Sequence, residues 1–149
     1  MTDRYTAYVL DPVQAQFKAQ LLPDVELNTI RTILGVEAVD TFAFDGQHTV
    51  YFDDEGLQNG LTHYITVQGQ PDPVVGFLVL LANADSGSRR PLMPIEDAAS
   101  AFSLYRPVMD PIFSAVRASH GDLTTFVSAV EGFETRIERF PLRVVAPSS

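Results

Sequence analysis

The chain has 149 residues, of which 46% are hydrophobic and 19% charged, with a net charge of −9 and no cysteine. This composition excludes a disordered chain and predicts one domain with its own core, and the lack of cysteine excludes disulfides, thiolate metal sites and a cysteine nucleophile. The nearly apolar run Val74–Ala82 is too short to span a bilayer and no signal-peptide pattern is present, so we expect a cytoplasmic protein.

The negative charge is concentrated in one part of the chain. Residues 32–88 contain eight acidic residues and neither lysine nor arginine, whereas residues 89–149 contain seven acids and seven arginines. Binding to nucleic acid or to an anionic membrane requires a basic surface. We therefore expect no phosphate binding by residues 32–88 and no membrane partner.

The first half is predicted to be mostly strand. Arg4–Leu10 alternates as a strand does. A short amphipathic helix over Val25–Leu34 is expected next, capped by Asp24 and ended by Gly35. Four more strands are expected, with Gly46 and Gly56 in turns that use a positive φ: Val36–Phe44, His48–Phe52, Leu61–Val67 and the apolar Val74–Leu81.

The C-terminal half is predicted to be helical. A helix begins near Pro94, a second runs from Asp110 to about Ser119 with His120 at its end, and a third carries the stripe Leu123, Phe126, Val127 and Val130. A final edge strand is expected over Arg136–Val145. The predicted fold class is therefore α+β: a mostly antiparallel sheet of about five strands, covered by a short N-terminal helix and two or three C-terminal helices. Residues 1–145 form one domain, with 1–88 β-rich, 89–145 helical and 146–149 a frayed tail.

Part of the chain resembles a known family. The segments that carry the resemblance are Tyr8–Pro12, Ile33–Gly35, Val39-Asp40, Val50–Leu57 with its Asp-Asp-Glu-Gly turn, and Val75–Leu80. In this order they resemble a family of small uncharacterised proteins encoded by phages, plasmids and bacteria. The resemblance covers about residues 5–88. It implies the strand order and an accessory role on a mobile element, and it implies no activity or site residue.

Asp53, Asp54 and Glu55 are the first candidate binding residues. Adjacent carboxylates suit a hard cation such as Ca²⁺ or Mg²⁺, but their spacing does not match an EF-hand loop. The alternative is a solvated hairpin end in which the aspartates accept hydrogen bonds from turn amides. We favour the turn and expect no metal site.

His63, Arg89 and Arg90 are the other candidates. His63 falls on the apolar side of its predicted strand, where a base or a hydrogen-bonded edge residue are both compatible with the pattern. Arg89 and Arg90 follow a Ser-Gly-Ser loop that has the charge for a phosphate but not the Walker pattern. The three histidines show no zinc spacing and no Gly-x-Ser-x-Gly elbow is present, so no catalytic residue and no cofactor are predicted.

Two functions remain open at this point. The first is a non-enzymatic interaction module that uses its acidic β-rich surface to bind a basic protein partner, or that self-associates through the strand edge Leu61–Val67 as a homodimer. The alternative is a small-ligand-binding protein or enzyme with a pocket between sheet and helices, using His63, Asp53 or Arg89-Arg90.

Overall fold

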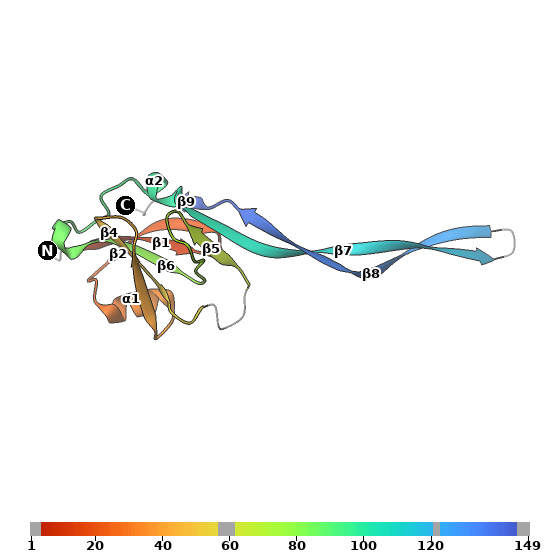
Figure 1. Cartoon of the computed structure of the whole chain (residues 1–149), viewed down its shortest axis with the longest axis horizontal. Coiled ribbons are helices and arrows are strands. Elements are labelled where there is room, and N and C mark those ends of the chain that lie inside the picture. Colours follow the sequence, from red (N-terminus) through yellow and green to blue (C-terminus); the bar gives the residue numbers. More distant parts are fainter. Residues whose placement is uncertain (1–3, 57–61, 121–122, 146–149) are drawn as a thin grey trace.

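The chain folds into a β-rich body from which a long two-stranded arm extends (Figure 1). The computed structural model describes residues 4–56, 62–120 and 123–145, and in the outer arm, residues 114–120 and 123–129, it describes the backbone only. The tail 146–149 lies outside these residues. No helix in the described part of the chain is both long and apolar enough to cross a membrane.

The body is built on a six-stranded sheet with the strand order β3-β4-β6-β1-β2-β9. Neighbouring strands are antiparallel except for β2 and β9, which are parallel. The strands are β1 (Tyr5–Asp11), β2 (Gln16–Leu22), β3 (Val39–Ala43), β4 (His48–Asp53), β6 (Leu78–Ala82) and β9 (Arg143–Val145).

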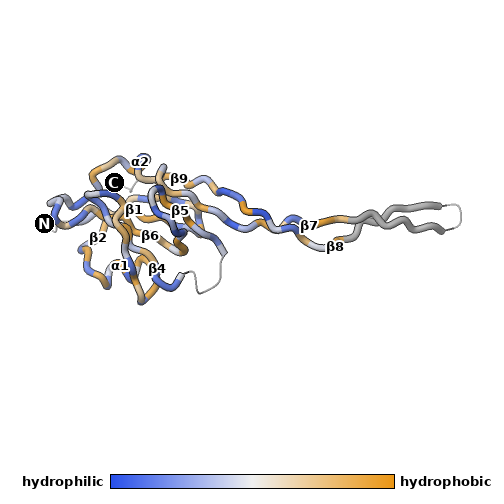
Figure 2. Tube along the Cα trace, in the orientation of Figure 1, coloured by the Kyte–Doolittle hydropathy of each residue, from blue (hydrophilic) through white to orange (hydrophobic). Residues whose placement is uncertain are grey.

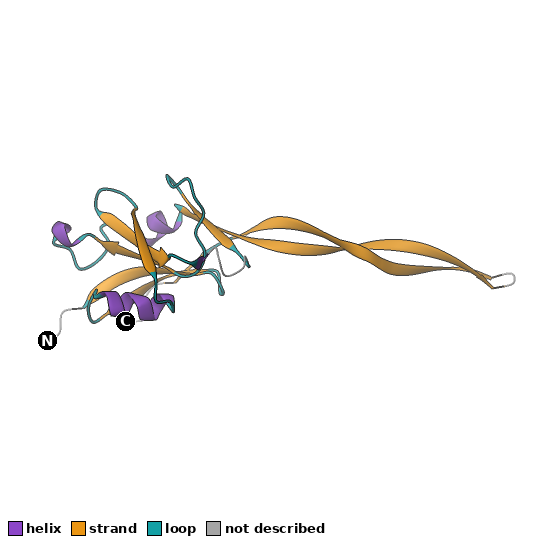
Figure 3. Cartoon of the chain, turned by 60° about the horizontal axis from the view of Figure 1, so that its bottom comes forward, coloured by secondary structure: helices purple, strands orange, loops and turns teal. Residues whose placement is uncertain are grey.

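Both faces of the central strands are buried, which explains why β6 is almost wholly apolar. On one face, Val79 and Leu81 pack in a cluster with Ile30 and Leu34 of α1 (Leu27–Leu34). This face of the sheet is the one that the helix covers in Figure 3. The predicted helix is confirmed, but it begins at Leu27, and Glu26 rather than Asp24 occupies its N-cap position. Gly35 ends it in the left-handed region with φ 70°.

The other face packs against a second sheet of three strands in the order β5-β7-β8. These strands are β5 (Tyr64–Val67), β7 (Phe102–His120) and β8 (Leu123–Phe140). Phe17 is buried between the layers, with its ring centroid 5.3 Å from that of Phe102. Full burial of such a side chain contributes about 1.5–3 kcal/mol. The base of the arm is therefore part of the core. Figure 2 shows the hydropathy along the trace, with both hydrophobic and hydrophilic stretches in the part of the arm that is not grey.

The helix predicted to begin near Pro94 is confirmed as a short one, but the prediction of the second and third C-terminal helices is wrong, and with it the α+β fold class. Residues expected in the second and third helices, including His120, lie in β7 and β8, which pair as one antiparallel hairpin. The described residues contain nine strands and two α-helices, α1 of eight residues and α2 (Ile95–Ala99) of five. The fold is mostly β, and a second sheet, rather than a set of helices, covers the other face.

The physical reason is that the apolar spacing in this segment suits either structure. Leu123, Phe126, Val127 and Val130 recur at helical intervals, but the same segment is rich in Thr, Val and Phe, which favour strands. Cross-strand pairing between residues up to 36 positions apart satisfies the backbone instead, as at Leu104–Phe140. Such pairing with a distant segment leaves no local signal in the sequence.

Candidate functional site

Asp53, Asp54 and Glu55 form the turn that ends β4. The backbone N–H of Glu55 donates to Asp53 Oδ1 at 2.9 Å, and the N–H of Asp54 donates to the Ala38 carbonyl at 3.1 Å. The side chains of Asp54 and Glu55 are exposed. Among the described residues, no three His, Cys, Asp or Glu side chains are grouped to hold a metal ion. The geometry favours the turn interpretation over a cation site.

Gly56 follows this turn and is required by close packing rather than by its backbone angle. A Cβ on Gly56 would lie 2.9 Å from the Val75 carbonyl oxygen and 3.2 Å from Val75 Cβ. Neither Gly56 nor Gly46 has a positive φ, so the prediction of left-handed turns at these two glycines is wrong. The constraint at Gly56 comes from a segment 19 positions away, which the local sequence does not reveal.

His63 lies just before β5 and is held by a loop of the body. Its Nε2 accepts the N–H of Gly76 at 2.9 Å, and its Nδ1 is 3.1 Å from the Thr62 hydroxyl. Burial and the positive charge of Arg106 lower the pKa of His63. Since an amide N–H can only donate, Nε2 carries no proton, and the ring is neutral. His63 therefore acts as a hydrogen-bond acceptor that fixes the loop.

Asp53 and His63 lie on either side of Gly76. A Cβ on Gly76 would be 3.8 Å from Asp53 Cβ, while the Gly76 N–H is the group that His63 accepts. The positive φ of Gly76, 95°, makes this close arrangement possible. The structure thus brings two predicted residues to one loop, with both side chains engaged in backbone hydrogen bonds.

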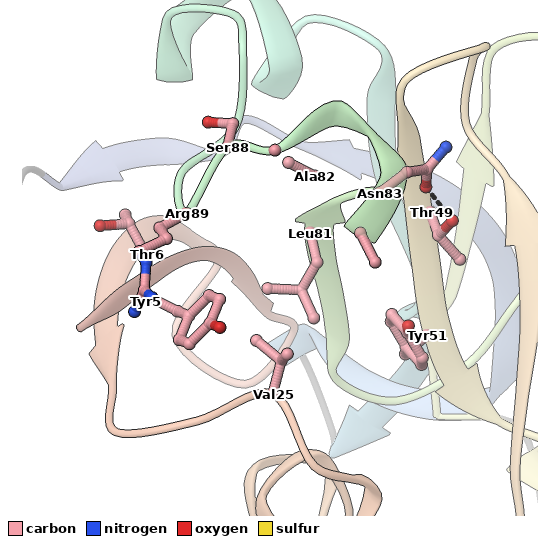
Figure 4. Close-up of a pocket in the computed structure, with 12 residues that line it drawn as sticks. Tyr5, Thr6, Val25, Thr49, Tyr51, Leu81, Ala82, Asn83, Ser88 and Arg89 are labelled. Carbon is pink, nitrogen blue, oxygen red and sulfur yellow. Dashed lines mark hydrogen bonds between the residues drawn. The ribbon is translucent and has the colours of Figure 1, made fainter. Parts of the chain in front are cut away.

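Arg89 lines a pocket on the α1 side of the six-stranded sheet. The pocket has a volume of about 400 Å³, and its walls carry Tyr5, Thr49, Tyr51 and Asn83. Figure 4 shows Leu81 and Val25 between the two tyrosines, with the polar pair Thr49 and Asn83 at one side. The Thr49 hydroxyl donates to Asn83 Oδ1 at 2.5 Å. We call this cavity the Arg89 pocket.

The charge of the Arg89 pocket comes from Arg89 itself. Its guanidinium carbon lies 4.9 Å from the centroid of the Tyr5 ring, a cation–π contact. Arg90 does not line this pocket. The positive charge of Arg90 instead acts on the Tyr8 hydroxyl and lowers its pKa. Burial of Tyr8 and the negative charge of Glu96 outweigh this effect, so the pKa of Tyr8 is raised. The two adjacent arginines therefore do not form one anion site.

His48 is a buried polar residue that the sequence reasoning did not single out. Its Nδ1 is 2.8 Å from Asp45 Oδ1, and its Nε2 accepts the N–H of Leu92 at 2.9 Å. Partial burial opposes ionisation of Asp45, but hydrogen bonds from Gln47 and His48 outweigh it and lower the Asp45 pKa. The Asp-Gly-Gln-His turn was the available signal. Through these two contacts, His48 ties the β3–β4 hairpin to the loop before α2.

Five acidic residues gather where β3 begins and β4 ends. β3 is an edge strand, and pairing of Val39 with Asp53 brings the two ends together. Four of the five side chains are exposed, and within the described residues none of the five forms an ion pair. We call this group the acidic edge: Glu37, Asp40, Asp53, Asp54 and Glu55. The other three acids of residues 32–88 lie elsewhere, so the acidic charge is only partly clustered.

One face of the arm exposes a row of apolar side chains. Beyond Tyr105, β7 pairs with β8 alone, and alternate residues of each strand point to the same side. The cross-strand pairs on this side are Pro107–Ile137, Met109–Thr135, Pro111–Phe133 and Phe113–Val130. The large side chains among them are 52% to 63% exposed. We call the seven apolar residues the apolar arm face: Pro107, Met109, Pro111, Phe113, Val130, Phe133 and Ile137.

The opposite side of the arm carries charges instead. Arg136 Nε donates to Asp110 Oδ2 across the strands at 2.6 Å, and Arg136 Nη1 donates to Glu138 at 3.1 Å. Both acids raise the pKa of Arg136, Asp110 more strongly. The ribbon is therefore two-faced: its charged residues lie on one side, together with Val108 and Ile112, and the apolar arm face lies on the other. The alternation Phe133-Glu134-Thr135-Arg136-Ile137-Glu138 in β8 was the signal for it.

Two comparisons with known proteins place the chain. It is 34% identical over 137 residues to the uncharacterized protein y4iR of Sinorhizobium fredii, a match that covers 91% of this chain and 85% of that protein. It is 30% identical over 125 residues to protein PsiB of Rhizobium leguminosarum bv. phaseoli, with 83% of this chain and 93% of PsiB covered. The chain belongs to the family of y4iR and PsiB. No family model and no solved structure matches it significantly.

The y4iR match extends into the segment that forms the arm. It covers 91% of this chain, whereas residues 1–101, which precede β7, make up about two thirds of it. The similarity to y4iR extends beyond residue 88, where the resemblance described from the sequence ended. The uncharacterised, bacterial character of the relatives is confirmed.

Proposed function

We propose that this protein is a non-enzymatic protein-interaction module whose main binding element is the β7–β8 arm. The observation that carries the proposal is the apolar arm face, a strip of seven apolar residues on a ribbon that neither layer of the body covers. Monomeric proteins rarely expose large apolar patches, and those that do use them mostly for association. An isolated two-stranded ribbon is also only marginally stable in water, so a partner would stabilise it.

The acidic edge supports a second contact, with a basic partner. Its five carboxylates are in a part of the chain that contains no lysine or arginine. Such a surface attracts a basic partner and speeds encounter more than it tightens binding. The contact should weaken as salt rises, because exposed charges are screened beyond about 10 Å at 0.1 M salt.

An enzymatic role has less support in the described residues. The carboxylate of Asp53 and the ring of His63 are both used in backbone hydrogen bonds. A base or nucleophile needs a second group within hydrogen-bond reach that activates it. His63 has the Thr62 hydroxyl and the Gly76 amide, and neither supplies that activation.

The test is site-specific photo-cross-linking in the native bacterium. A cross-linking residue in place of Met109, on the apolar arm face, should capture a protein, whereas one in place of the exposed Glu134, on the opposite side, should not. Equal capture at both positions, or none at either, would contradict the proposal. Capture that survives high salt would assign binding to the arm rather than to the acidic edge.

We propose a small anionic ligand for the Arg89 pocket as a second candidate function. The specific support is a cavity of about 400 Å³ with one arginine, two tyrosines and the Thr49–Asn83 pair. That volume lies within the range of small-molecule sites. Screening carboxylate and phosphate compounds by thermal shift tests this. Stabilisation of the native chain that Arg89→Ala abolishes and Arg90→Ala keeps would support it, and no hit would exclude it.

We infer that this module serves an accessory role, and we keep a plasmid or phage setting as part of the proposal. The bacterial relatives are compatible with that setting. The test is the set of genes that neighbour this gene and the y4iR gene. Conserved housekeeping neighbours in both cases would contradict it.

A further inference from the structure

We infer that the partner of the apolar arm face is a second copy of this chain, in a two-fold dimer in which two arms pack face to face and antiparallel. This inference rests on the proposed function and makes its partner specific. Three independent features of the arm carry it: the area that pairing would bury, the distribution of charge and the prolines of β7.

The area of the face is sufficient for a dimer. Phe113, Phe133, Met109, Val130 and Ile137 each expose more than half of the side chain. With roughly 80–100 Å² exposed for each such residue and for the two prolines, one face offers about 600 Å². Two faces would bury about 1,100–1,200 Å², which reaches the lower limit of specific interfaces. An isologous contact also needs only one surface, because the same patch serves both copies.

The charge distribution favours the antiparallel arrangement. The hairpin residues 102–140 contain five acids and four arginines, a net charge of −1. The remaining −8 of the net −9 belongs to the rest of the chain. Two arms can therefore approach with little repulsion. Two bodies repel each other, and an antiparallel pairing places them at opposite ends of the joined arms.

The prolines of β7 favour packing through the face rather than through the strand edge. Pro107 and Pro111 have no N–H. They are four residues apart in β7, so both occupy the same kind of position in the ladder with β8. Proline is tolerated in a sheet where its nitrogen faces the free edge, so the free edge of β7 lacks donors at two positions. The edge of β5, which we expected to pair, is already occupied at Ile65, where the N–H groups and carbonyls of Ile65 and Val74 bond to each other at 2.8 and 2.9 Å.

Sedimentation equilibrium of the full chain, at rising concentration and at two salt concentrations, tests the inference. The expected mass is twice 16.4 kDa, and the dimer should strengthen with salt because screening relieves repulsion between the bodies. Phe133→Asp should shift the protein to monomer, with at least a tenfold loss of affinity. The matched control Glu134→Gln, on the same strand and the opposite side, should remain dimeric.

A cysteine-pairing experiment tests the antiparallel register, since the chain has no cysteine of its own. Ile137→Cys, near the body, should form a disulfide with Val130→Cys, farther out, when the two variants are mixed and oxidised, and each should cross-link poorly with itself. Self-linking of both variants would indicate a parallel pair and overturn the arrangement.

The outcomes separate this inference from the proposed function. A wild-type chain that stays monomeric at all concentrations overturns the inference, and so does a Phe133→Asp variant that stays dimeric with unchanged thermal unfolding. If the monomeric chain still cross-links to another protein at Met109, the proposed function stands and only the identity of the partner is wrong. If neither association is found, both fail.

Discussion

The guanidinium of Arg106 lies 4.6 Å from the ring centroid of Phe140, at the level where the arm leaves the body. The same guanidinium donates to the carbonyls of Pro12 and Val13 in the β1–β2 turn. One side chain thus joins β7, β8 and a distant turn of the six-stranded sheet. Beyond this point the two strands contact only each other, so Arg106 fixes the direction in which the apolar arm face is presented.

Arg106→Ala should loosen the base of the arm. Loss of the cation–π contact and of two hydrogen bonds should lower the free energy of unfolding by about 1–2 kcal/mol, measured by urea denaturation. Hydrogen exchange at Phe102–Tyr105 should become faster. The control Arg136→Ala removes an exposed ion pair farther along the arm and should leave stability nearly unchanged. Equal losses in the two variants would contradict a special role for Arg106.

His63 should make stability depend on pH. Its folded pKa lies below the ordinary value of 6.5, so the unfolded chain binds the proton more readily. The contribution of the neutral His63 ring to the free energy of unfolding is complete above pH 6.5. It is lost as the pH falls through 6.5 toward the lowered folded pKa. Urea midpoints for the wild type and His63→Gln between pH 8 and pH 5 check this. The wild type should lose more stability than the variant, and parallel profiles would refute the effect.

Gly56→Ala should destabilise the body because its Cβ would meet the backbone of Val75 at 2.9 Å. Such overpacking costs about 1–3 kcal/mol. Gly46→Ala is the matched control, since nothing lies within 4 Å of its Cβ position and its φ is not positive. We expect a change within about 0.5 kcal/mol there. Thermal unfolding of both variants distinguishes close packing from a general intolerance of alanine in turns.

His48→Leu should cost about 1–3 kcal/mol, because the N–H of Leu92 loses its acceptor, the buried ring of His48. Asp45→Asn retains the ring and that acceptor, so it should cost less. Chemical denaturation of the two variants checks the order. A larger loss for Asp45→Asn would show that the contact of His48 Nδ1 with Asp45, and not that of Nε2 with the Leu92 amide, dominates the contribution of His48.

The sequence by itself determined the elements whose signals are local. β1 and β4 followed from alternation, α1 from its apolar spacing and the Gly35 stop, and the buried character of β6 from its composition. The lack of lysine and arginine in residues 32–88 predicted an acidic surface near β3 and β4, and the acidic edge lies there. Among the candidate site residues, the sequence predicted that Asp53 accepts a hydrogen bond from a turn amide, because aspartate is typical of such turns.

Only the tertiary structure decided the remainder. The apolar residues between Asp110 and Val130 suit a helix or a strand, and only pairing of β7 with β8 selects the strand. The Arg89 pocket joins residues of β1, β4 and β6 with Arg89, which is 84 positions from Tyr5, and Gly56 is constrained by Val75. Each of these depends on contacts between distant segments, whose free energy is gained only after the chain has closed the loops between them, so local periodicity carries no trace of them.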